Sequence, residues 1–437
     1  MNLCAFTRAT ALNNWTFCNS CTRPQKMTAQ SGATSTQLHV QPALSRWQLA
    51  ASSALSPFAL VVVSPLLPEL RRIYQAPESE IAYVLSAYLI GLGVAQLLLG
   101  ALSDRHGRRP VLLISLAVYA IMSVVCAYAP TLEWLIAARF LQAFGAAGTA
   151  AICRASVHDV HHGDTAAYYM SYIAAAHSLA HTMAPVVGGY AGDLFGFSGV
   201  FLGLSMLGVA MGAWSWRAMP ETRPRATDGQ AFGLLHLLAV NGRLLKSPVF
   251  VCYAMIYGLT GAPFFAFLAA APAYFADHFS IQGGAFGMYW SFMSVAFLMG
   301  AMGSARLVKR LGRKNLLALM VGGSGAIGAS YPFFVLLLDA TPLTLIAPLV
   351  LLSLFLGFIT PLTLSGAITT HPTMAGTASG LCGALTMAAS ALLTIAAGAF
   401  YDGTGLGLTW SMSGSMVSML GFYLTLRVFE RRTKTAL

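Results

Sequence analysis

Long apolar runs separated by short polar links make up the chain from about residue 47 onward. A transmembrane helix needs about 20 mainly apolar residues, because each backbone group left unpaired in hydrocarbon costs several kcal/mol. Twelve runs reach this length and predict twelve membrane-spanning helices. They cover residues 47–68, 81–102, 110–129, 133–154, 166–190, 197–216, 248–272, 283–304, 315–338, 342–364, 376–400 and 406–428.

The longest polar stretch after the N-terminal tail falls between the sixth and seventh runs. We therefore expect an all-α membrane protein built of two six-helix bundles. The expected parts are a polar, disordered tail, a first bundle, a cytoplasmic linker, a second bundle and a cytoplasmic tail, at residues 1–46, 47–216, 217–247, 248–428 and 429–437. The first tail has no apolar run of signal-peptide length, and Met27 is a second candidate start, so translation of residues 1–26 stays open.

Composition agrees with a membrane protein, since 57% of the 437 residues are hydrophobic and 9% are charged, against about 25% charged in soluble domains. The net charge is +11, and 22 of the 25 basic residues fall on one side of the predicted membrane. This positive-inside bias predicts that both termini lie in the cytoplasm. The basic residues then contact anionic membrane lipids, and nucleic-acid binding is not expected.

The seven cysteines do not form a secreted disulfide framework, because four of them lie inside predicted helices. Cys18 and Cys21 form a CxxC in the tail, but no second ligand pair accompanies them. We expect no cofactor and no bound metal.

A charged link repeats within the chain. "DRHGRRP" at 104–110 recurs as "KRLGRKN" at 309–315, displaced by 205 residues, each time between the second and third helices of a half. Two similar six-helix halves are the organisation of a two-bundle secondary transporter, with its substrate near the bilayer midplane between the halves.

These residues resemble the major facilitator superfamily, and within it the Bcr/CflA-like drug-efflux branch. "RFLQAFGAAG" at 139–148 resembles the family's fourth-helix motif, "MAPVVGG" at 183–189 its exporter motif, and "PETR" at 220–223 the exit from its sixth helix. The family's loop signature G-x-x-x-D-R-x-G-R-R matches Gly100, Asp104, Arg105, Gly107, Arg108 and Arg109.

The resemblance implies a monomeric, secondary active exporter of the bacterial inner membrane, with no enzymatic chemistry and no catalytic residues. Its two halves alternate access to a central site for a small-molecule substrate, and export is driven by exchange for protons. The expected cargo is a small amphiphile, as in drug or antibiotic efflux.

The loop signature has two readings. Gly107 permits a tight turn and the arginines hold it at anionic headgroups, which alone would set topology. The resemblance adds that Asp104 contacts the arginines and a neighbouring helix end, and so locks a cytoplasmic gate in one of two arrangements. We favour the gate, because the spacing exceeds what topology requires.

The second copy departs from the signature, since Lys309 replaces the acid and Ala305 the first glycine. We expect that copy to orient its half without locking it. Its remaining residues are Arg310, Gly312, Arg313 and Lys314.

Pro185, Gly188 and Gly189 predict a bent helix that another helix approaches closely. By resemblance, this seam separates the halves on the outer side and limits leakage during export.

None of the fourteen acidic residues falls near the predicted midplane. Members of the branch carry a proton-binding acid in the first helix, but Val61 stands at that place. This departure leaves open which residue carries the proton.

Arg139 is the basic residue placed deepest in a predicted helix, and Gln142 lies one turn away. Either could contact a substrate, and an arginine there would favour carboxylates and disfavour cations. The alternative is a structural hydrogen bond to helix carbonyls.

His177 and His181 share one face of the fifth helix. This pair could carry the proton, since histidine titrates near neutral pH. The alternatives are two hydrogen-bonded residues in a helix interface or, less favoured, a metal site without a third ligand at fixed spacing.

Other functions stay open. The cargo could be an endogenous acidic metabolite such as a siderophore. A transporter-like sensor would keep the fold without flux, and an intramembrane metalloenzyme would need further ligands beside the histidines.

Overall fold

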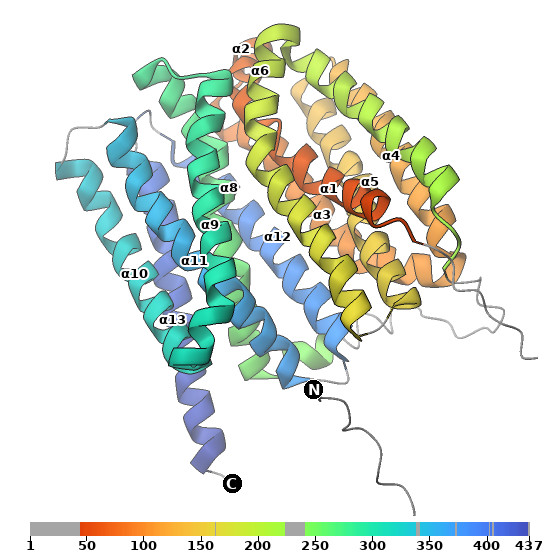
Figure 1. Ribbon diagram of the computed structural model, residues 1–437. Coiled ribbons are helices and arrows are strands. Elements are labelled where there is room, and N and C mark those ends of the chain that lie inside the picture. Colours follow the sequence, from red (N-terminus) through yellow and green to blue (C-terminus); the bar gives the residue numbers. More distant parts are fainter. Residues whose placement is uncertain are drawn as a thin grey trace, which may run out of the picture. The chain divides into compact units, whose positions relative to one another are not determined.

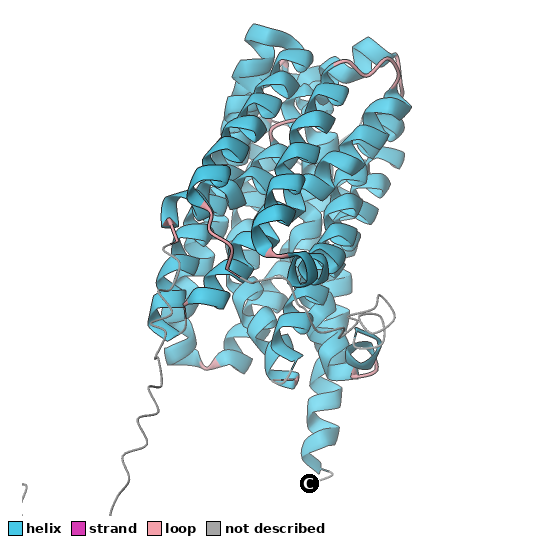
Figure 2. Ribbon diagram, turned by 90° about the vertical axis from the view of Figure 1, so that its right-hand side faces the viewer, coloured by secondary structure: helices cyan, strands magenta, loops and turns pink. Residues whose placement is uncertain are grey.

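The computed structural model describes residues 44–161, 163–222, 241–337, 341–371, 374–401, 403 and 406–435, and the regular structure in these ranges is helical (Figure 2). The predicted tail before residue 44 and the central part of the predicted linker, 223–240, lie outside them. The helices are α1 (Arg46–Val61), η1 (Ser64–Leu66), α2 (Leu67–Tyr74), α3 (Glu78–His106), α4 (Arg108–Ala127), α5 (Leu132–Val160), α6 (Gly163–Ala218), α8 (Pro248–Phe279), α9 (Gly283–Leu311), α10 (Arg313–Leu337), α11 (Pro342–Thr370), α12 (Ala375–Ala399) and α13 (Leu406–Thr435).

Twelve membrane crossings follow from these helices. Ten stretches of the described residues are long and apolar enough to span a bilayer. One of them, within α6, runs over 51 residues, which at about 1.5 Å per residue is more than twice a hydrocarbon core of about 30 Å. It bends at Gly196 and so crosses twice, and the more polar α13 adds the twelfth crossing.

Two of the membrane segments are broken for identifiable reasons. The first, Arg46–Tyr74, changes from α1 to α2 through the short helix η1, which carries Pro65 in its first turn. In α6, Gly196 has φ of 66°, a conformation that side-chain-bearing residues rarely adopt. The carboxylate of Glu69 then accepts a hydrogen bond from the Phe197 amide at 3.2 Å and so caps the helix that restarts there.

Helices α1 to α6 form one half of the part from Pro42 onward and α8 to α13 the other, as Figure 1 shows. This confirms the predicted fold of two six-helix bundles, while the exact domain boundaries remain predictions. Across the division, α6 lies beside α9 and α3 lies beside α12.

The two helices α6 and α9 approach each other at glycines. A Cβ on Gly189 would lie 2.2 Å from the backbone carbon of Gly283, and one on Gly287 would lie 2.6 Å from that of Pro185. Gly188 points elsewhere, toward the Val62 carbonyl of the first membrane segment. We call the contact at Gly189, Gly283 and Gly287 the α6–α9 seam.

Proline adds a second contact to the seam. Pro185 has no amide hydrogen, so the His181 carbonyl lacks its partner one turn along the helix. The indole Nε1 of Trp290, from the other half, donates to that carbonyl at 2.9 Å. A carbonyl released by the proline therefore joins the two halves.

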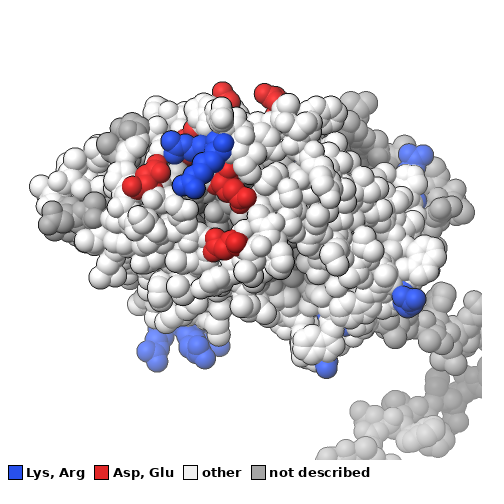
Figure 3. All heavy atoms as spheres, turned by 90° about the horizontal axis from the view of Figure 1, so that it is seen from above, with Lys and Arg blue, Asp and Glu red and all other residues white. Residues whose placement is uncertain are grey.

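We call the end of the bundle with Arg71 and Asp277 the outer end, and the end with Asp104 the inner end, following the predicted orientation. At the outer end Arg71 of α2 pairs with Asp277 of α8 at 3.3 Å, and the Tyr401 hydroxyl donates to the same carboxylate at 3.4 Å. Figure 3 shows that basic side chains gather at one place on this face, with acidic ones around them. Both partners of the ion pair are about half exposed, so its free energy is small, about 0–1 kcal/mol.

The seam is testable with a matched pair of glycines in α6. We expect Gly189→Ala to lower the unfolding temperature, because its methyl group would overlap the Gly283 backbone. Gly203→Ala is the control: its Cβ meets no heavy atom within 4 Å, so alanine there should leave stability unchanged or raise it, by about 0.5–1 kcal/mol at most. Thermal unfolding of both variants in one detergent checks this, and unaltered stability of Gly189→Ala would contradict the close approach.

Candidate functional site

The inner loop between α3 and α4 makes its turn at Gly107, as the sequence predicts. Its φ of 94° and ψ of 153° suit glycine alone. A Cβ there would also lie 2.6 Å from the Glu221 carboxylate, which accepts from the Arg108 and Arg109 amides at 2.8 and 3.2 Å. Glu221 therefore caps the N-terminus of α4, where its negative charge also suits the helix dipole.

Arg108 is the centre of the loop's charge network and is only 4% exposed. Its guanidinium contacts Asp104 at 2.6 Å and Asp159 of α5 at 2.8 Å, and donates to the Ser103 hydroxyl at 2.6 Å. Two carboxylates and a hydroxyl thus offset the cost of burying this cation. Sequence reasoning did not assign Asp159 or Glu221 to the loop, since they lie 51 and 113 residues away from Arg108.

The other residues of the signature are less enclosed. The exposed Arg105 makes no described contact, and Gly100 has no heavy atom within 4 Å of a Cβ position. Arg109 donates to the Trp216 carbonyl at 2.6 Å and lies over that indole ring at 5.4 Å.

The second-half loop is held in a similar way. Gly312 has φ of 74°, and Lys314 pairs with Glu430 of α13 at 2.8 Å. Glu430 also accepts from the Tyr253 hydroxyl at 2.9 Å. Each half therefore holds its basic loop with an acid located at the end of its own last helix. The remaining basic residues differ, as Arg310 is exposed and Arg313 lies over the Tyr253 ring at 5.6 Å.

Arg139 and Gln142 lie inside the first half and not along the cavity described below. Arg139 is fully buried, donates to the Ala59 carbonyl at 3.2 Å and to the Gln142 side chain at 2.6 Å, and lies 4.1 Å from the centre of the Tyr88 ring. Gln142 donates in turn to Ser123 at 2.6 Å. Because α1 ends two residues after Ala59, Arg139 caps a carbonyl in its last turn, which favours the structural alternative.

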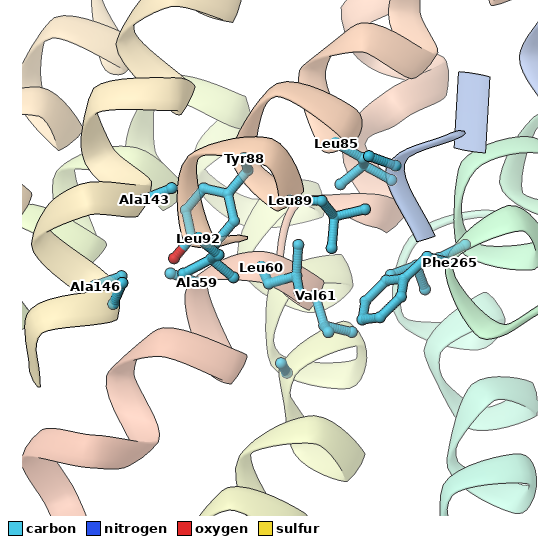
Figure 4. Packing of buried hydrophobic residues seen from close by; sticks show 14 of the residues in the cluster. Ala59, Leu60, Val61, Leu85, Tyr88, Leu89, Leu92, Ala143, Ala146 and Phe265 are labelled. Carbon is cyan, nitrogen blue, oxygen red and sulfur yellow. The ribbon is translucent and has the colours of Figure 1, made fainter. Parts of the chain in front are cut away.

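Val61 occupies an apolar contact between the halves. It is fully buried at the end of α1, and Figure 4 shows it beside Leu89 of α3 and facing Phe265 of α8. A carboxylate at this position would be surrounded by hydrocarbon. The apolar packing around Val61 therefore suits a valine and not the acid that the family carries at this position.

A cavity of about 410 Å³ lies between the two halves. Helix α6 of the first half lines one side, and α8, α9, α11 and α12 of the second half line the rest. Phe264, Phe265 and Trp290 contribute aromatic rings to the lining, and the Phe264 ring packs edge-on against Trp290 at 5.9 Å. The described lining contains no carboxylate; its other members are His177, Ser178, His181, Thr182, Tyr257, Thr260, Gly261, Ser294, Phe297, Leu298, Thr360, Thr386 and Met387.

The structure brings His177 and His181 together on the wall of this cavity. The Nδ1 of His181 lies 3.3 Å from the His177 carbonyl, and among the described residues the Nε2 of His177 has no hydrogen-bond partner. Within the same residues, no group of three or more possible ligands could hold a metal ion. Both rings thus line the space between the halves.

Helix α5 runs further than predicted. The fourth predicted helix ends at residue 154, whereas α5 continues to Val160. Arg154 therefore lies within α5, where it is partly exposed.

Gly107 and Gly312 form a matched pair for testing the loop. Alanine at either position should cost about 1–3 kcal/mol of backbone strain, since both glycines have positive φ. Gly107→Ala should cost more, because only there does the methyl group displace a capping carboxylate. Unfolding temperatures measured side by side check this order, and an equal loss in the two variants would exclude a role for the Glu221 cap.

Comparison with known proteins agrees with this architecture. The chain is 24% identical over 386 residues to the bicyclomycin resistance protein homolog of Haemophilus influenzae, covering 87% of this chain and 96% of that protein. It is 26% identical over 389 residues to multidrug resistance protein D of Escherichia coli, and the match covers 86% of this chain and 94% of that protein. In fold it is similar to a bacterial homolog of the human lysosomal transporter Spinster, solved in an inward-facing and occupied conformation, with a TM-score of 0.68. The two sequences are 13% identical, and the match covers 88% of this chain and 96% of that chain.

These relatives confirm the resemblance to the drug-efflux branch. Residues 49–394 match the Major Facilitator Superfamily, which spans most of the chain. The protein is therefore a multi-pass membrane transporter and not an enzyme, and it belongs to the major facilitator superfamily.

Proposed function

We propose that this protein exports small amphiphilic compounds from the cytoplasm by alternating access. The observation that carries the proposal is the cavity between the halves, which is large enough for a drug-sized ligand and combines aromatic rings with a few polar groups. The resistance proteins among the relatives support efflux as the direction of transport.

The contacts at the outer end support the same cycle. The α6–α9 seam and the Arg71–Asp277 pair join the halves there. Neither contact is strong, since one is a close approach of backbones and the other an exposed ion pair. Both could therefore break and reform as the halves rock.

We assign the inner gate to the loop around Asp104. Its partner Arg108 also contacts Asp159, so the loop keeps one carboxylate when Asp104 is neutralised. This arrangement allows Asp104 to change partners during the cycle while the fold is preserved.

Export is testable in an efflux-deficient bacterial host. Expression of the wild type should lower the intracellular accumulation of chloramphenicol or bicyclomycin. The variant Asp104→Asn should lose at least about nine-tenths of this lowering, because losing an interaction worth about 1.4 kcal/mol slows transport about tenfold. Accumulation of the labelled drugs is the measurement, and membrane abundance shows that the variant inserts. Glu80→Gln, at an exposed acid of α3, is the control and should keep wild-type export.

Two outcomes would count against this assignment. Wild-type export by Asp104→Asn would contradict the gate. A folded wild-type protein that changes the accumulation of no compound tested would contradict export and favour a transporter-like sensor.

We further propose that export is coupled to proton entry and that His177 and His181 carry the proton. The absence of a carboxylate from the described lining supports this role, and His177 and His181 are the histidines of that lining. Histidine is the side chain whose ordinary pKa lies near neutral pH. The protein then works as a monomer in the bacterial inner membrane with both termini cytoplasmic, which the distribution of basic residues supports.

The coupling predicts a specific loss. The double variant His177→Ala, His181→Ala should lose the stimulation of transport by an imposed pH gradient, because no proton-binding pair would remain on the wall. Transport into everted membrane vesicles, with and without the gradient, is the measurement. His278→Ala, an exposed histidine of α8, should respond like the wild type. If the double variant still responds fully, the pair has no part in coupling.

A second candidate is export of an endogenous acidic metabolite, such as a siderophore. The specific observation in its favour is again the lining without described carboxylates, which would not repel an anion. Metabolite secretion by deletion and parent strains distinguishes it from drug efflux.

A further inference from the structure

Glu78 is a buried acid at the outer end of the molecule. It is the first residue of α3, ahead of the predicted span 81–102, and it is only 6% exposed. Both of its carboxylate oxygens are buried, and neither has a hydrogen-bond partner among the described residues. An ionised carboxylate in such a place costs far more than a neutral carboxyl group, so a buried acid without a partner binds a proton.

Helix α12 of the second half packs against the turn that carries Glu78. A Cβ on Gly398 of α12 would lie 3.3 Å from the carbonyl oxygen of Glu78 and 2.5 Å from the Cβ of Ala82, one turn along α3. This close approach belongs to the contact between α3 and α12, which lie in different halves. Separation of the two helices at Gly398 would therefore admit water to the first turn of α3.

The charged and titratable groups around Glu78 bind one another. Arg71 of α2, Asp277 of α8 and Tyr401 after α12 act on Glu78 electrostatically. Arg71 pairs with Asp277 at 3.3 Å, and the Tyr401 hydroxyl donates to the same carboxylate at 3.4 Å. The Tyr401 amide donates to the Gly398 carbonyl at 3.3 Å, which ties this network to the glycine beside Glu78. The one cation of the network is thus already shared with Asp277.

From these contacts we propose that Glu78 is a proton-binding site that favours closure of the outer end. Its carboxylate takes up a proton from the outer solution as α3 and α12 meet, and returns that proton to the same solution as they part. The site is separate from the histidine pair of the cavity, and its proton does not cross the membrane. The proposal rests on the alternating access of the proposed function and adds its regulation by the pH outside.

The direction of the effect follows from the two environments of the carboxyl group. A glutamate in water ionises near pH 4, whereas burial without a partner can raise that value by as much as about 3–5 pH units. Proton binding therefore stabilises the closed form fully below about pH 4, and this stabilisation is lost as the pH rises through the higher value. Acid outside should close the outer end, and neutral to alkaline pH should open it.

Distances across the outer end test the proposal in the purified full-length chain. Spin labels are attached at Ile73→Cys of α2 and Gln282→Cys before α9, two exposed positions in different halves, with the other cysteines replaced by serine. Double electron–electron resonance then gives the ratio of closed to open molecules at pH 5 and pH 8.5. We expect this ratio to fall at least about tenfold over that range, as one proton bound more tightly by the closed form would give.

Substitutions identify the group that responds. Glu78→Gln carries a neutral amide of the same shape as the protonated acid, so it should stay closed at both pH values. Glu78→Ala removes the acid altogether and should likewise lose the response to pH. Glu80→Gln, at an exposed acid of the same helix, and His278→Ala, at an exposed histidine beside Asp277, should keep the response of the parent protein. Unfolding temperatures show that each variant is folded.

The results separate this site from export itself. A closed-to-open ratio that does not change with pH in the parent protein, or a change that persists in Glu78→Gln and Glu78→Ala, would overturn the proposal. Loss of the response in His278→Ala would overturn it as well, by assigning the proton to the histidine. Because the measurement requires no flux, the response can be found in a protein that exports nothing. Export by a protein whose outer end ignores pH would leave the proposed function intact and reject the site.

Discussion

The close approach of α6 and α9 joins the two halves toward the outer end, beside the second contact between the halves, that of α3 and α12. Helices in a bilayer gain little by burying leucine against leucine, because the lipid is equally apolar, so association requires close backbone packing or polar contacts. The seam supplies both, with Gly189 against Gly283 and Trp290 donating to the His181 carbonyl. The second contact exists because Pro185 leaves that carbonyl without its helical partner. The same proline thus provides a polar contact between the halves.

The cost of burying a charge separates the roles of two arginines. Arg108 is buried with two carboxylates, which marks a structural network that a gate can use. Arg139 is buried against a carbonyl and the Tyr88 ring, which stabilises the broken end of α1.

The two inner loops show how similar halves can serve different purposes. Both turn at a glycine with positive φ, and in both an acid at the end of the last helix of that half contacts the basic residues. Only the first loop has Asp104, and only its glycine faces a carboxylate in place of a Cβ. The shared contacts hold each loop against its own half, and the additional acid fits a gating role confined to the first.

Local properties of the sequence determined the membrane segments, the turn at Gly107, the carbonyl released by Pro185 and the likeness of the two loops, because hydropathy, glycine conformation and proline chemistry act over a few neighbouring residues. Tertiary structure alone decided which polar residue meets which. Glu221 reaches Arg108 across 113 positions, and Arg139 turns into the first half. Which side of a helix faces the partner half depends on how the helices pack against one another, and hydropathy along the chain carries no information about that packing.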